Sequence, residues 1–134
     1  MADTVTSQTI QDGEKTAILK FTNESDGTGE ASVKKVDVSA LSKDSRGRSC
    51  SSVSISRIYW ACRGMGVDIE FDATTNVLAI PLPADSTGDE YYDLFTGIPN
   101  NAGSGVTGDI DFTTVAHSNG DAYMIVLVLT KNYS

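Results

Sequence analysis

Ala122-Tyr-Met-Ile-Val-Leu-Val-Leu-Thr130 is the stretch that decides the fold of this 134-residue chain. Apolar residues occupy both alternating faces of this segment, which is the pattern of a fully buried strand. Such a strand belongs at the centre of a sandwich or in an oligomer core. The apolar run from Ala122 to Leu129 is far shorter than the roughly 20 residues that a membrane-spanning helix needs, so no membrane partner is expected.

Two neighbouring segments are typical of a β-hairpin. Val67-Asp-Ile-Glu-Phe71 alternates apolar and acidic residues, and Val77-Leu-Ala-Ile-Pro-Leu82 follows after a turn-like stretch. Because Pro81 cannot donate a hydrogen bond to a ladder, the second segment should be an edge strand or a strand end. Further strands are expected at Thr16–Phe21, Ala31–Val38, Val53–Cys62 and Asp109–Val115, with phase slips at Lys34-Lys35 and Ser56-Arg57 that predict β-bulges.

The composition favours the same fold class. The chain is rich in Asp, Ser, Thr and Gly, which favour turns and loops over helices. We predict an all-β protein, a single-domain β-sandwich or jelly-roll-like barrel of about eight strands. Residues 14–134 should form this domain. Residues 1–13, which have only Val5 and Ile10 as large apolar side chains, should be an N-terminal arm or an edge strand.

Charge is distributed unevenly along the chain, whose formal net charge is −8. Residues 31–63 hold seven of the ten basic residues, whereas residues 64–130 hold ten acidic residues and no Lys or Arg. We expect no nucleic-acid partner, because phosphate binding depends on clustered positive charge. A basic segment on an acidic body suits protein contacts, although the same charges can simply solvate two faces of the fold.

Two segments are candidates for protein contacts. Arg forms bidentate pairs with carboxylates and is enriched at interfaces, so the basic segment is suited to joining neighbouring subunits. Residues 83–108 exceed the usual length of a connection and should form an irregular docking loop with one helical turn near Glu90. The candidate interface residues are Arg46, Arg48, Arg57 and Arg63 in the first segment, and Asp89, Glu90, Tyr91 and Tyr92 in the second.

The sequence indicates no catalytic or cofactor chemistry. Gly103-Ser-Gly-Val-Thr-Gly108 has the spelling of a dinucleotide-binding loop, but a predicted strand follows it instead of a helix, so we interpret it as a flexible turn. His117 is the only histidine, and its spacing from Cys50 and Cys62 is not that of a zinc site. We expect reduced cysteines, no cofactor, no metal and no enzymatic activity.

Several phrases, taken together, resemble a known family. They are Thr9-Ile-Gln-Asp-Gly13, Lys20-Phe-Thr-Asn23, Ser25-Asp-Gly-Thr-Gly-Glu30, Val33-Lys-Lys-Val-Asp-Val-Ser39 and Gly108-Asp-Ile-Asp-Phe-Thr-Thr-Val-Ala-His117. Over nearly its whole length the chain is similar to small virion structural proteins of tailed bacteriophages, including marine and cyanobacterial ones. The resemblance assigns a function to no individual residue.

The resemblance implies a capsid decoration, or cement, protein on the outer surface of the virion, made in the host cytoplasm. Its partners would be the major capsid protein and further copies of itself, often as a homotrimer. The first residues lack the basic and apolar regions of a signal peptide, which agrees with cytoplasmic synthesis. The alternatives are a tail, neck or fibre-associated component, a carbohydrate-binding β-sandwich, or a hydrolase with its site in residues 83–108.

Overall fold

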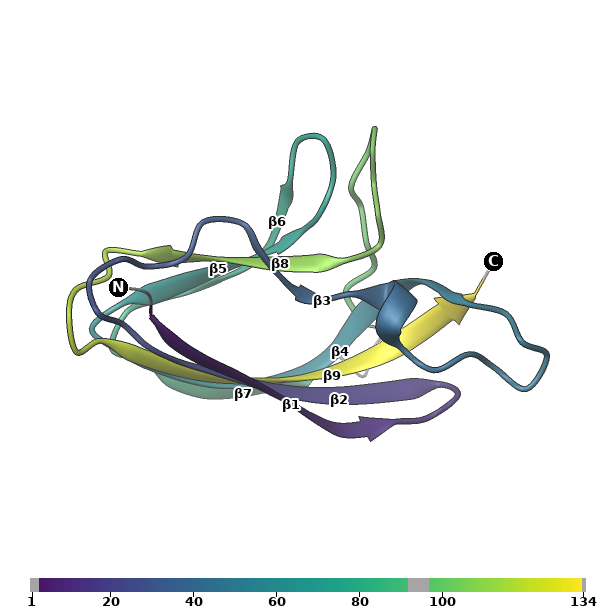
Figure 1. The fold of residues 1–134 in the computed structure, drawn as a ribbon, viewed down its shortest axis with the longest axis horizontal. Helices are drawn as coiled ribbons and strands as arrows, with labels where there is room; N and C mark the ends of the chain where they lie inside the picture. The colour runs from purple at the N-terminus through teal and green to yellow at the C-terminus, as the bar shows by residue number, and fades with distance from the viewer. Residues whose placement is uncertain (1–2, 92–96, 134) are drawn as a thin grey trace.

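The computed structural model describes residues 3–91 and 97–133. Within this part of the chain, nine strands form two antiparallel sheets that pack face to face (Figure 1). The five-stranded sheet contains, in ladder order, β1 (Thr4–Asp12), β2 (Thr16–Glu24), β9 (Ala122–Tyr133), β4 (Cys50–Arg63) and β7 (Thr87–Tyr91). The four-stranded sheet contains β3 (Val33–Val36), β8 (Ile110–Val115), β5 (Gly66–Phe71) and β6 (Val77–Leu82). The predicted single-domain β-sandwich is confirmed.

The long apolar segment forms β9, the central strand of the five-stranded sheet. It pairs with β2 on one side and with β4 on the other. Alternate side chains of β9 are buried in the core, namely Tyr123, Ile125, Leu127 and Leu129. The side chains between them, Met124, Val126 and Val128, are half-buried on the opposite face of the sheet. One face of β9 therefore builds the core and the other remains outside the sandwich.

An aromatic cluster joins the two sheets across the core. The ring of Phe112, on β8, packs edge to face against Phe21 of β2, with 5.3 Å between the ring centroids. Tyr123 of β9 packs against the same ring at 5.9 Å. Because Phe112 belongs to one sheet and its two neighbours to the other, this cluster holds the layers together.

Local features of the ladders agree with most of the expected pattern. The β3–β8 ladder shifts register between Lys34 and Val36, and the β4–β9 ladder shifts between Ile55 and Arg57, so both predicted bulges are present. β5 and β6 form the predicted hairpin, and Pro81 lies in the edge strand β6.

The helical turn predicted near Glu90 is wrong, because residues 87–91 form strand β7. The sequence Thr-Gly-Asp-Glu-Tyr has little intrinsic strand preference. Pairing with residues 57–61 of β4 supplies the backbone hydrogen bonds that local preference does not. This strand shortens the stretch that was expected to be one long irregular loop.

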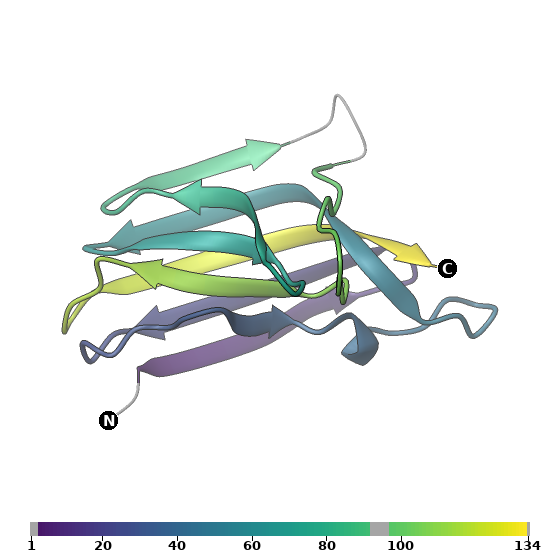
Figure 2. The same cartoon turned by 90° about the horizontal axis from the view of Figure 1, so that it is seen from above.

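The two edges of the five-stranded sheet are β1 and β7, which lie on opposite sides of the molecule (Figure 2). β1 pairs with β2 as an antiparallel hairpin within the chain. The one helical segment in the described part of the chain is the short 3-10 helix η1 (Val38–Ala40). No described helix has the length and apolar character to cross a membrane.

Candidate functional site

The face of the five-stranded sheet that points away from the second sheet carries an apolar stripe. We call this surface the outer face. The strand registers place Val128 between Ile18 and Arg57, Val126 between Lys20 and Tyr59, and Met124 between Thr22 and Ala61. The uncovered face of an antiparallel sheet is usually polar. An apolar stripe on β9 with a polar rim has the composition of a protein-binding surface.

Arg57 organises one side of the outer face. Its Nε and Nη2 atoms donate to the two carboxylate oxygens of Asp89 at 3.1 and 2.9 Å. Its guanidinium carbon lies 4.7 Å from the ring centroid of Tyr59 and 5.3 Å from that of Tyr91. The hydrogen bonds lower the pKa of Asp89 and raise the pKa of Arg57. A bidentate ion pair stacked on two rings holds these side chains in one arrangement before any partner binds.

Three of the predicted interface residues thus meet on the outer face: Arg57, Asp89 and Tyr91. Tyr59 joins them and was not among the predicted residues, although its separation of two residues from Arg57 places both side chains on the same face of a strand. Glu90 lies between Asp89 and Tyr91 on β7 and is exposed. Tyr92 lies outside the described residues.

The other three arginines lie far from this cluster. Arg46 and Arg48 are in the loop before β4, and Arg63, the last residue of that strand, is six residues beyond Arg57, roughly 20 Å along it. Arg48 donates to Asp44 at 2.6 Å, and Arg63 donates to the carbonyl oxygen of Gly120 at 3.0 Å. The arginines therefore form no single basic patch, and a role for these three in a subunit contact remains a prediction.

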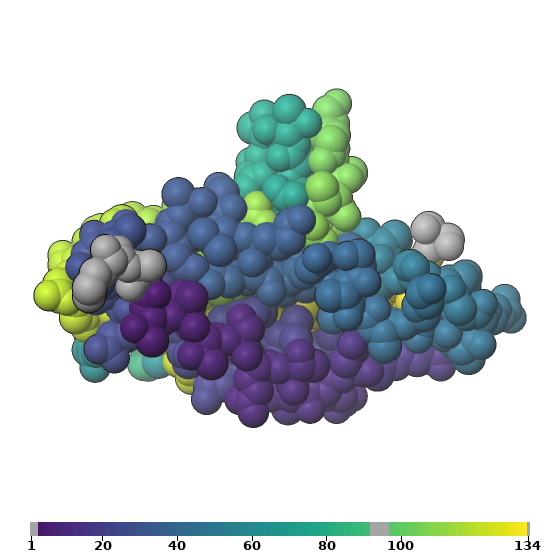
Figure 3. All heavy atoms as spheres, viewed as in Figure 1, coloured from purple at the N-terminus to yellow at the C-terminus, as the bar shows by residue number. Residues whose placement is uncertain are grey.

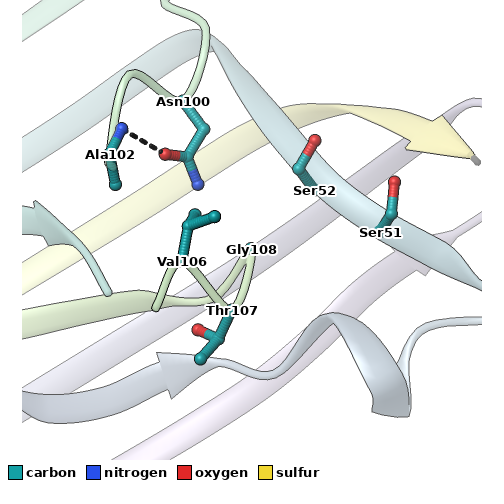
Figure 4. Close-up of a pocket in the computed structure, with 7 residues that line it drawn as sticks. All are labelled: Ser51, Ser52, Asn100, Ala102, Val106, Thr107 and Gly108. Carbon is teal, nitrogen blue, oxygen red and sulfur yellow. Dashed lines mark hydrogen bonds between the residues drawn. The ribbon is translucent and has the colours of Figure 1, made fainter. Parts of the chain in front are cut away.

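A groove of about 240 Å³ lies between the start of β4 and residues 100–108 (Figure 4). It is lined by Ser51, Ser52, Asn100, Ala102, Val106, Thr107 and Gly108. The backbone N–H of Ala102 donates to Oδ1 of Asn100 at 2.9 Å. The G-x-G-x-x-G motif contains a turn, in which the N–H of Val106 donates to the carbonyl oxygen of Gly103. Gly108 has φ +87°, and a Cβ there would lie 2.0 Å from the carbonyl oxygen of Ser51, so this glycine permits a close backbone contact.

The residues considered for catalysis or metal binding are spread over the fold. Nδ1 of His117 lies 3.2 Å from the Thr114 hydroxyl. Cys50 and Cys62 are free and buried, and burial raises the pKa of both thiols. Within residues 3–91 and 97–133, no group of three or more His, Cys, Asp or Glu side chains is arranged to hold a metal ion.

The outward side of the four-stranded sheet has a different character, because it carries Asp68 and Glu70 on β5 and the buried Asp111 on β8. Burial, together with the nearby carboxyl of Asp72, raises the pKa of Asp111 to about 6. A hydrogen bond from the Thr107 hydroxyl lowers the pKa of Asp72. Nδ2 of Asn76 donates to Oδ2 of Asp111 at 3.1 Å, while Oδ1 of Asp111 is buried without a partner. The Asp111 carboxyl thus retains its proton at a pH where Asp72 is ionised.

Replacement of Asp111 by asparagine should stabilise the protein relative to the unchanged chain, and this gain should be larger at neutral pH than at pH 4. The folded chain holds the Asp111 proton up to about pH 6, whereas an unfolded chain releases it near pH 4. Stability from this group therefore decreases as pH rises through that window. The Asp111→Asn gain should grow by roughly 1–3 kcal/mol between pH 4 and 7 in urea unfolding. A stability difference that is independent of pH would contradict the assignment.

Comparisons with protein-family models, curated protein sequences and solved structures found no match for this chain.

Proposed function

We propose that this chain is a structural subunit of a virus particle, a decoration protein that binds the outer shell through the outer face of its five-stranded sheet. The observation that carries the proposal is the apolar stripe on β9, which the second sheet leaves uncovered. The fixed cluster of Arg57, Asp89, Tyr59 and Tyr91 lies beside it. Tyrosine and arginine are enriched among the residues that dominate binding energy at protein interfaces.

The resemblance to small virion structural proteins of tailed bacteriophages supplies the kind of partner, which is the major capsid protein. An apolar stripe bordered by Lys20 and by an ion pair suits a folded protein surface. The chain's acidic remainder favours solubility and limits non-specific association. The proposal therefore assigns the outer face to the shell and leaves the acidic four-stranded sheet facing solvent.

Particle composition provides the direct test. Virions from cells expressing the chain are purified on a density gradient, and the chain is quantified on stained gels against the major capsid protein. A copy number comparable to that of the capsid protein supports the proposal. A few copies per particle would instead assign the chain to the tail or neck, and complete absence from the particles would overturn a virion role.

Replacement of Met124 by glutamate should abolish binding to shells while the isolated chain stays folded. Met124 lies directly opposite the uncharged Thr22 and Ala61, in the middle of the apolar stripe, so a carboxylate there must be desolvated when the stripe is covered on binding. The measurement is co-sedimentation of the purified variant with particles that lack the chain. Val115→Glu, on the four-stranded sheet at a residue 44% exposed, is the matched control and should bind normally.

A second binding variant, Tyr91→Ala, makes the test independent of any packing change at Met124. Tyr91 is 60% exposed, so its truncation should leave the melting temperature almost unchanged. Tyrosine is enriched among the residues that dominate binding energy at interfaces, so loss of this aromatic contact should weaken shell binding by roughly tenfold. Normal binding by both variants would show that the outer face is not the contact surface.

The two tyrosines also bear on the carbohydrate-binding alternative. Sugar rings stack on exposed aromatic faces, and Tyr59 and Tyr91 are on the outer face. The Arg57 guanidinium already lies over both rings, so a sugar would have to displace it or use the opposite ring faces. This arrangement favours a protein partner.

A further inference from the structure

The four edges of the two sheets differ in how they are protected against pairing with other strands. Natural edge strands are usually short, charged, bulged or interrupted by proline. β3 has four residues, including two lysines, and β6 contains Pro81. β7 has five residues and carries Asp89 and Glu90.

β1 is the least protected of the four edges, since its bulge and its one charged residue, Asp12, lie at its C-terminal end. It has nine residues, and the segment Thr4–Gln11 contains no charged residue, proline or glycine. Its residues are exposed along almost the whole strand, and the purple N-terminal atoms lie on the surface in Figure 3. Val5 is 48% exposed and Ile10 53%. A bulge occurs between Thr9 and Gln11, so the strand is regular from Thr4 to Thr9. The regular part presents unpaired backbone N–H and C=O groups along its free side.

The charge of the molecule indicates what pairs with this edge. Two copies of a chain with net charge −8 repel each other, so a contact between copies needs a surface without carboxylates. The uncharged segment of β1 is such a surface. A strand that pairs with its own copy in antiparallel orientation forms an isologous contact across a twofold axis. The Thr, Ser and Gln side chains on both strands also place no like charges opposite one another, and like charges there would destabilise the pairing.

We propose that β1 pairs with β1 of a second copy, joining two five-stranded sheets into one continuous ten-stranded sheet. A pairing centred on Ser7 leaves the bulge outside the regular ladder. It places Thr6 opposite Gln8 of the second copy, and Val5 opposite Thr9 of the second copy. The exposed Val5 side chain is then covered by the new neighbour. This inference is independent of shell binding, because it concerns the purified chain alone.

Analytical ultracentrifugation of the purified chain over a range of concentrations tests the pairing. The expected species is a dimer, and association should strengthen with added salt, which screens the net negative charge. A chain that stays monomeric, or one that forms a trimer, would overturn the proposal, because β1–β1 pairs cannot build an odd-numbered oligomer.

Two threonines at opposite ends of one cross-strand row supply a matched pair of variants. Thr6 on β1, Thr22, Met124, Ala61 and Thr87 on β7 form this row across the sheet. Thr6→Lys should weaken dimerisation by roughly 2- to 30-fold, since two altered pairs occur in each dimer. Thr87→Lys adds the same charge to the other edge and should leave dimerisation unchanged. Equal effects of the two variants would contradict the pairing.

A cysteine at the centre of the pairing gives a second, covalent readout. Directly opposite residues of antiparallel strands have Cα atoms about 4.5–5.5 Å apart, within the range of a disulfide. Ser7→Cys should therefore give a disulfide-linked dimer on mild oxidation, and Thr87→Cys should not. The natural cysteines, Cys50 and Cys62, are 4% and 7% exposed and should not contribute. Absence of the Ser7→Cys dimer from an oxidised sample would count against the twofold centre at Ser7.

Discussion

Replacement of Glu30 by alanine should lower the free energy of unfolding by about 3–5 kcal/mol. The Glu30 and Lys35 side chains are each only 6% exposed, and their charged atoms lie 2.5 Å apart. Oε1 of Glu30 also accepts hydrogen bonds from Nδ2 of Asn23 at 2.8 Å and from the Tyr123 hydroxyl at 2.6 Å. The variant leaves a buried ammonium group without its carboxylate and the Tyr123 hydroxyl without its acceptor, and it removes one of the two acceptors of Nδ2 of Asn23. Urea unfolding at pH 7 provides the measurement.

Glu30→Gln separates the charge from the hydrogen bonds in the same cluster. The amide oxygen can still accept from Asn23 and Tyr123, so this variant removes the ion pair but retains an acceptor. It should therefore lie between the unchanged chain and Glu30→Ala in stability. If the free energy of unfolding of Glu30→Ala lies within 1 kcal/mol of that of the unchanged chain, the Glu30–Lys35 pair is solvated in solution and contributes little to stability.

The buried Glu30 cluster shows where sequence reasoning about the fold ends. The alternation and length of residues 122–130 predict a central strand because a two-residue period is visible locally. Burial of Glu30 depends on Tyr123, which is 93 residues away in sequence, and no local pattern reveals that contact. β7 was missed for the same reason, because its partner in β4 determines its conformation and its own residues do not.

The candidate site shows a similar division. Arg57 and Tyr91 could be selected from the sequence because arginine and tyrosine are enriched at interfaces, and Asp89 because a carboxylate can form a bidentate pair with arginine. Their convergence required the β4–β7 register, which places Arg57 opposite Tyr91. Grouping all four arginines as one segment overlooked the length of β4, since a 14-residue strand separates its two ends widely.

Replacement of Phe112 by alanine should destabilise the protein by about 3–5 kcal/mol, the range measured when a buried aromatic is truncated. Phe112 is fully buried and contacts Phe21 and Tyr123 of the opposite sheet. Its removal leaves a cavity between two layers whose strands are held in place by their own ladders, which limits collapse around the gap. Such a loss is a large part of the roughly 5–15 kcal/mol by which domains of this kind are stable.

Val115→Ala on the same strand is the matched control for Phe112→Ala. Val115 is 44% exposed on the outside of the four-stranded sheet, so its truncation should change stability by no more than about 0.5 kcal/mol. Thermal melts of both variants should then show a large decrease for Phe112→Ala and almost none for Val115→Ala. Equal, small decreases would mean that the four-stranded sheet is not fixed on the five-stranded sheet by the aromatic cluster. Shell binding through the outer face would in that case depend on the five-stranded sheet alone.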